Sequence, residues 1–239
     1  MKTAARWSTP LVALTTALML LCGGLPLSAR EVQSHGLLFE KWLRDTFFGG
    51  YQPQGYTQKW DIPASANPHH GGIPANPKAA KLGSPIGLGD ALRQFDIQEP
   101  FLIIVGFWEQ ASPTHKRWVN VQAVRVEPAQ WRRLWGGIQR THLERLNAII
   151  KDKSLSLEEA RAQVQVLKAQ EPYASALIEL NPKIDRSQRR LQCSLGFQIF
   201  FDHLAPGAER GPQEKPAVFG VPIPARFTSA PRQITPEQR

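Results

Sequence analysis

The sequence predicts an α/β fold, with a central mixed β-sheet flanked by helices, from three observations. Residues 101–108 (FLIIVGFW) are an uninterrupted run of β-formers, which is typical of an interior strand covered on both faces. Residues 117–126 alternate apolar and polar side chains after a turn at residues 112–115, so we expect them to form a hairpin with that run. Residues 35–48 are amphipathic with helical spacing and end at Gly49, which predicts a helix ahead of the sheet.

Shorter elements are predicted between this helix and the hairpin. Residues 56–62 place apolar residues on either side of Asp61 and predict a short strand. A strand at Lys78 is expected to be short, because Pro77 has no N–H to donate to a neighbouring strand. Residues 90–95 predict one or two helical turns.

Helical additions are predicted after the hairpin. Pro128 suits the first turn of a helix. Residues 141–144 (THLE) and 156–159 (SLEE) have the pattern of capping boxes ahead of apolar periodic runs, which predicts two more helices. Residues 192–204 are apolar and fit either a helix or a strand.

The chain is expected to have three parts. Residues 1–29 have the pattern of an export signal and residues 35–204 are predicted to form a single α/β domain. Seven prolines follow residue 204, so residues 205–239 are predicted to be a mostly irregular tail. Residues 218–223 are apolar enough to dock against the domain.

The export signal predicts a periplasmic or secreted protein. Lys2 and Arg6 precede an apolar run at residues 11–21, which is shorter than the roughly 20 residues that span a bilayer. We therefore expect no transmembrane helix in the mature chain. Lipidation at Cys22 is disfavoured because Leu21 stands where a lipoprotein site has a small residue.

Charge and cysteine content limit the partners and the chemistry. The formal charge of +9 falls to +7 without residues 1–29. A basic exported protein suits an anionic partner, whether nucleic acid, an anionic glycan or a lipid headgroup. Cys193 would be the single cysteine left, which precludes an intramolecular disulfide. Its apolar surroundings favour a packed thiol over a nucleophile.

Three charged residues can form a Mg²⁺-dependent phosphodiesterase site. Glu40 lies on the first predicted helix, Asp61 on the predicted short strand and Lys78 further along the chain. Carboxylates are ligands for a hard cation, and a lysine can hold the attacked phosphate or the nucleophilic water. Each residue also has a plainer interpretation. Glu40 can pair with Arg44 four residues on, Asp61 can face solvent, and Lys78 can be a solvated loop charge.

The order of these elements resembles the PD-(D/E)XK restriction-endonuclease-like superfamily over residues 36–126. The resemblance implies a mixed sheet flanked by helices and Mg²⁺-dependent DNA hydrolysis, with Glu40 and Asp61 as metal ligands and Lys78 as the catalytic lysine. The sequence departs from the family at Asn76, where a second acid is expected and asparagine supplies no charge. Asp90 is the candidate substitute metal ligand, although it also fits a helix N-cap. Without a substitute, the scaffold would only bind.

Basic residues supply candidate nucleic-acid contacts at Lys81, Arg93, Arg189 and Arg190. The cluster at residues 183–190 also fits a solvated helix start. His69 and His70 lack the spaced partners of a zinc site. The motifs of serine hydrolases, zinc proteases and nucleotide-binding enzymes do not occur. Two hypotheses remain: a metal-dependent nuclease, or a non-catalytic basic envelope protein that binds an anionic partner.

Overall fold

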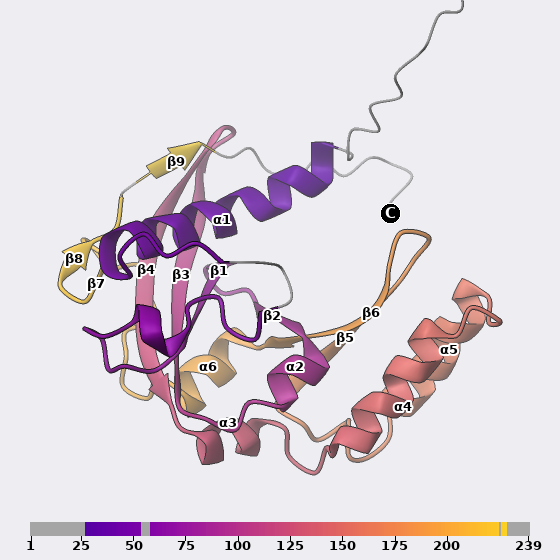
Figure 1. Ribbon diagram of the computed structural model, residues 1–239. Helices are drawn as coiled ribbons and strands as arrows, with labels where there is room; N and C mark the ends of the chain where they lie inside the picture. Colours follow the sequence, from indigo (N-terminus) through magenta and orange to yellow (C-terminus); the bar gives the residue numbers. More distant parts are fainter. Residues whose placement is uncertain (1–26, 54–57, 225, 229–239) are drawn as a thin grey trace, which may run out of the picture.

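The computed structural model describes residues 27–53, 58–224 and 226–228, with the backbone alone for residues 27–35 and 228. It has an α/β architecture in which a mixed, curled sheet is flanked by helices (Figure 1). The predicted fold class is confirmed at this level. Most of the predicted export signal, including Cys22, lies outside the described residues.

A four-stranded sheet contains the predicted hairpin. Its order is β1 (Ala75–Lys81), β3 (Phe101–Ser112), β4 (His115–Val126) and β9 (Arg226–Thr228). β3 runs parallel to β1 and antiparallel to β4, and β9 pairs with the far edge of β4. The predictions of an interior strand at residues 101–108 and of its hairpin partner are both confirmed.

A second, antiparallel sheet extends from the first. Its order is β2 (Ile86–Asp90), β6 (Arg189–Leu195) and β5 (Ile178–Ile184), and β2 follows β1 after a short turn. The interpretation of residues 183–190 as a helix start is wrong, because they form the β5–β6 hairpin. The Asp185 carboxylate closes its turn by accepting backbone N–H bonds from Ser187 at 2.7 Å and Gln188 at 2.8 Å.

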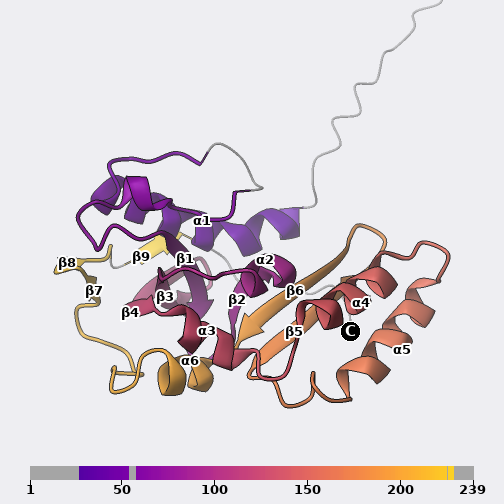
Figure 2. The same cartoon turned by 60° about the horizontal axis from the view of Figure 1, so that its bottom comes forward.

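Helices pack against both sheets (Figures 1 and 2). α1 (Leu27–Phe47) crosses one face of the four-stranded sheet, where Phe39 and Leu43 pack in a core with Ile104 and Trp118. The other helices are α2 (Ala91–Phe95), α3 (Pro128–Leu134), α4 (Arg140–Lys151), α5 (Leu157–Lys168) and α6 (Phe197–His203). Their buried side chains join a second core with Ile103, Val105 and Phe107. Alternate residues of β3 thus serve two cores, as expected for an interior strand.

Local sequence signals predicted several helix ends correctly. α1 ends at Phe47, and Gly49 and Gly50 just beyond it have left-handed φ angles of 59° and 71°. The Ser156 box is confirmed, since its hydroxyl accepts from the Glu159 N–H at 3.1 Å and Glu159 accepts from the Ser156 N–H at 2.9 Å. The prediction of a capping box at residues 141–144 is wrong. Gln139 caps α4 and His142 accepts its N–H, because the helix begins at Arg140.

Two strand predictions need correction. No strand forms over the described part of residues 56–62, where Ile62 makes a single bridge to Ala75. β1 has seven residues despite Pro77, because it lies at the edge of its sheet, where a missing N–H is tolerated. The ambiguous segment at residues 192–204 contains both a strand, to Leu195, and the helix α6.

Residues 217–223 of the tail dock against the domain, on the α1 face of the sheet. β7 (Ala217–Val218) and β8 (Val221–Pro222) form a small hairpin, and Val218 and Ile223 are buried in the core beneath α1. None of the described helices combines the length and the apolar composition that a membrane crossing requires.

Candidate functional site

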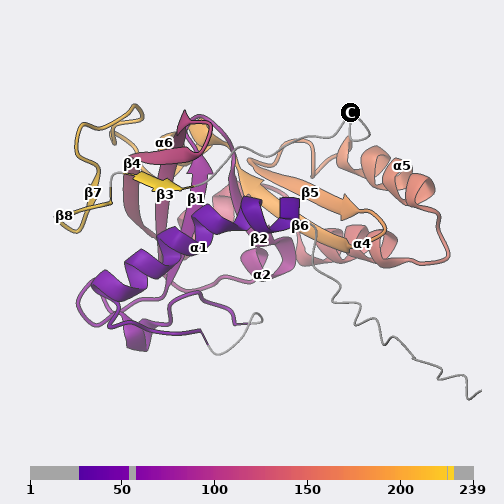
Figure 3. The same cartoon turned by 90° about the horizontal axis from the view of Figure 1, so that it is seen from above.

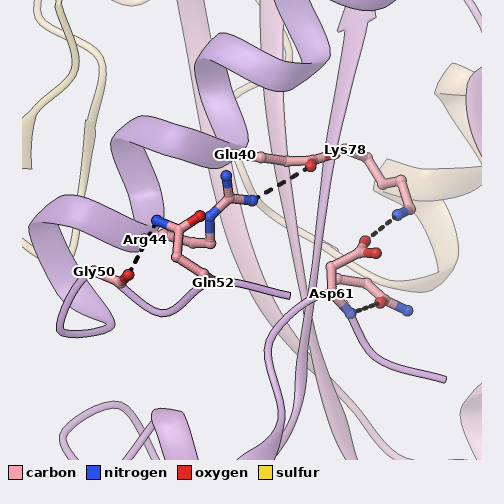
Figure 4. A network of polar contacts seen from close by, with 7 residues as sticks. Glu40, Arg44, Gly50, Gln52, Asp61 and Lys78 are labelled. Atoms are coloured by element: carbon pink, nitrogen blue, oxygen red, sulfur yellow. Dashed lines mark hydrogen bonds and ion pairs between the residues drawn. The ribbon is translucent and has the colours of Figure 1, made fainter. Parts of the chain in front are cut away.

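The structure brings together Asp61 and Lys78, which are 17 residues apart. Lys78 Nζ donates to Asp61 Oδ2 at 2.9 Å (Figure 4). The bridge between Ile62 and Ala75 causes this contact, because its two backbone hydrogen bonds of 3.0 and 2.8 Å hold the loop against β1. The Asp61 N–H also donates to Asn76 Oδ1 at 3.5 Å. Asp61 is therefore held at the edge of the sheet, with Lys78 as its counter-charge.

Glu40 reaches the same region from α1. Its neighbour Phe39 packs against Gly106 of β3, so the helix lies close to the sheet. The pKa of Glu40 is raised, first by burial and next by the negative charge of Asp61, while Lys78 and Arg44 oppose the shift. Glu40 thus lies within electrostatic reach of both members of the ion pair.

The plainer interpretation of Glu40 is also observed. Arg44 Nη1 lies 3.7 Å from Glu40 Oε2, which is a long contact for an ion pair. The Arg44 side chain is only 12% exposed, and its Nε has no hydrogen-bond partner among the described residues. Sequence reasoning treated Arg44 only as a helix-surface partner. Its i,i+4 spacing was the available signal, whereas its burial depends on how α1 packs.

The donor set suits Mg²⁺ better than zinc. Within the described ranges, no group of three His, Cys, Asp or Glu side chains lies close enough to hold an ion by itself. Magnesium commonly retains several waters and uses one or two carboxylates together with substrate phosphates. Glu40 and Asp61 can supply those two carboxylates. Lys78 would then remain beside them to hold a phosphate oxygen or a water.

Asn76 and Asp90 occupy structural positions. Asn76 is 3% exposed and its side-chain oxygen is turned to the Asp61 N–H. Asp90 caps α2 by accepting the Arg93 N–H at 2.9 Å, which confirms the N-cap interpretation. Asp90 is not among the charges that shift the pKa of Glu40. Its role as a third metal ligand therefore stays a prediction.

Cys193 is a packed thiol. It is 2% exposed, and burial raises its pKa, with the Asp90 charge as the next contribution. A thiol held protonated is a poor nucleophile, as its apolar sequence context indicated. Lys78 acts in the opposite direction on this pKa, so β6 lies within electrostatic reach of the ion pair.

The four basic residues predicted to bind nucleic acid have different environments. Lys81 is exposed at the end of β1, and Arg93 Nη1 donates to the Gln58 carbonyl at 3.2 Å. Arg189 has a structural role, because its guanidinium donates to the backbone oxygens of Asp152 and, at 2.9 Å, of Leu155. Arg190 is exposed and free of such bonds within the described part of the chain.

Comparisons of the chain with protein-family models, with curated proteins and with solved structures find no match. The case for a function therefore depends on the geometry of the site.

Replacing Glu40 by glutamine is expected to stabilise the metal-free protein at pH 7. A carboxyl with a raised folded-state pKa binds more protons when folded, so its ionisation lowers the free energy of unfolding as pH rises through that pKa. The rise in Tm over wild type in EDTA should therefore be present at pH 7 and vanish towards pH 4. Thermal melts check this, with Glu144→Gln at an exposed ion pair as control. A lower Tm for Glu40→Gln at pH 7 would contradict the burial argument.

Proposed function

We propose that this protein is a Mg²⁺-dependent phosphodiesterase that acts on DNA, built on a restriction-endonuclease-like core. The ion pair of Lys78 with Asp61, within electrostatic reach of Glu40 on α1, carries the proposal. Burial and the Asp61 charge both raise the pKa of Glu40, so a divalent cation between the two carboxylates would relieve their repulsion. The basic surplus of the chain suits a polyanionic substrate.

Each residue would have a separate role. Glu40 and Asp61 would hold the ion, which when bound lowers the pKa of a coordinated water and neutralises charge on the phosphate. Lys78, now paired with Asp61, would turn its ammonium to a phosphate oxygen or to the attacking water. Asn76 would fix the Asp61 backbone and so hold the carboxylate at the edge of the sheet.

A nicking assay tests this function. Supercoiled plasmid incubated with the protein should be nicked with Mg²⁺ and not with EDTA. Asp61→Asn should lower the rate by at least about 100-fold, because it removes a metal ligand. Glu109→Gln is the matched control, since it removes an exposed ion pair with Arg117 elsewhere. Equal nicking by wild type and Asp61→Asn would exclude this site as the catalytic one.

The second candidate function is a non-catalytic envelope protein on the same scaffold that binds an anionic partner. The buried Asn76 favours this function, because the asparagine side chain has no carboxylate that could bind a metal ion. Such a protein would bind a polyanion equally well in EDTA and in Mg²⁺, show no nicking, and lose affinity steeply as salt rises.

A further inference from the structure

The β5–β6 hairpin has one apolar and one polar face. The side chains on the apolar face join the core beneath α4 and α5: Ile178, Leu180, Ile184, Leu191, Cys193 and Leu195. The residues between them point the other way, because side chains alternate along a strand. They form cross-strand pairs in register: Lys183 with Arg190, Asn181 with Gln192, and Glu179 with Ser194. Figure 3 shows the molecule from above, with β6 beside β2 and β5 beyond β6.

Three side chains on this polar face are available to a ligand. Lys183 and Arg190 are exposed and Gln192 is half-buried. None of them makes a hydrogen bond or an ion pair with any other described residue. At the base of the hairpin the polar groups are already paired, since the Ser194 hydroxyl accepts from Asn181 at 2.7 Å and donates to Glu179 at 3.1 Å. The free donors therefore lie in the half nearer the turn.

This half of the face adjoins the candidate site. Gln192 pairs with Asp90 of β2 in register, and β2 directly follows the strand that carries Lys78. β1 and β2 also lie in contact with each other. A ligand laid along the hairpin from Arg190 to Gln192 would thus continue towards Lys78.

We propose that Lys183, Arg190 and Gln192 form a binding face for duplex DNA that leads the phosphodiester backbone to the Asp61–Lys78 pair. This inference rests on the proposed function and names the surface that holds its substrate. The Lys183 ammonium and Arg190 guanidinium groups suit phosphates. The Gln192 amide can donate to N7 of an adenine and accept from its N6–H group. A two-stranded ribbon fits the major groove of B-DNA, about 12 Å wide, whereas the major groove of duplex RNA is too narrow to admit it.

Equilibrium binding of a fluorescent DNA duplex in EDTA tests the face without hydrolysis. The double variant Lys183→Ala with Arg190→Ala should weaken binding about tenfold or more. It should also reduce the slope of log affinity against log salt by about two, since each phosphate contact contributes about 0.9. Arg133→Ala with Lys215→Ala is the matched control, because both are exposed and free of bonds within the described chain. Gln192→Ala should weaken binding with an unchanged salt slope.

Arg189→Ala provides an internal control for folding. It should lower the Tm, because Arg189 ties the hairpin to the backbone of Asp152 and Leu155, whereas Arg190→Ala should leave the Tm unchanged. Unchanged duplex affinity in the folded double variant overturns the inference, and so does an equal loss in the control pair. Binding to heparin or to anionic vesicles that exceeds binding to the duplex would overturn the assignment to DNA. Duplex binding that needs this face without Mg²⁺-dependent nicking would refute the proposed function alone.

Discussion

Lys78→Met is expected to lower the nicking rate by at least about 100-fold while increasing the stabilisation that Mg²⁺ gives. Lys78 Nζ donates to Asp61 Oδ2 at 2.9 Å, and its charge also lowers the pKa of Glu40. Without the Lys78 ammonium, no nearby positive charge from this residue offsets the repulsion between the Glu40 and Asp61 carboxylates. A divalent cation then relieves more repulsion and should bind more tightly. The metal-free protein should melt at a lower temperature, because one charge of a partly buried pair loses its partner.

The nicking rate and the Mg²⁺-dependent rise in Tm distinguish a catalytic role of Lys78 from a metal-binding one. Loss of nicking together with tighter Mg²⁺ binding, measured by the rise in Tm on titration, identifies Lys78 as a group that acts on substrate or water. Lys153→Met is the matched control, since Lys153 is an exposed lysine in the turn between α4 and α5. Nicking that survives in Lys78→Met, or a smaller effect of Mg²⁺ on its Tm, would contradict the assignment.

The fold could be predicted from sequence where its signals are local. The uninterrupted run of β-formers in β3 predicts a strand by itself. The Ser156 capping box needs only Ser156 and Glu159 to pair the free N–H groups at the start of α5. β2 and β5 were missed for physical reasons. Gly87 and Gly89 interrupt the apolar pattern of β2 at a register shift, and Pro182 obscures β5. Pairing with β6 holds both strands in place, and sequence alone does not reveal that pairing.

The residues of the candidate site could be proposed from the sequence, but their contacts could not. Glu40, Asp61 and Lys78 could be chosen because their order resembles that of a known site. The contact between Asp61 and Lys78 depends on the bridge between Ile62 and Ala75, which is a tertiary contact. The different roles of Arg189 and Arg190 were equally hidden. The two residues look alike in sequence, and the strand's alternation directs one towards the fold and the other towards solvent.

Gly106→Ala is expected to give the largest loss of stability among these variants. A Cβ at Gly106 would lie 2.8 and 2.9 Å from two ring carbons of Phe39 and 2.9 Å from the Trp118 ring. Both rings are buried, with centroids 4.9 Å apart, so neither can move without disturbing the core beneath α1. Overpacking of this kind costs about 1–3 kcal/mol, and each kcal/mol lowers the Tm by about 2–4 °C in a protein of this size.

The same substitution should also impair the site, because Phe39 precedes Glu40 on α1. Displacing the helix moves the Glu40 carboxylate away from Asp61, so Gly106→Ala should lower both the Tm and the stabilisation by Mg²⁺. Gly87→Ala is the matched control, since a Cβ there meets nothing within 4 Å. Adding Phe39→Leu to Gly106→Ala should restore part of both quantities, because the smaller side chain makes room for the new methyl group. Melts of the four combinations at these two positions measure this coupling, and purely additive effects would show that α1 does not rest on Gly106.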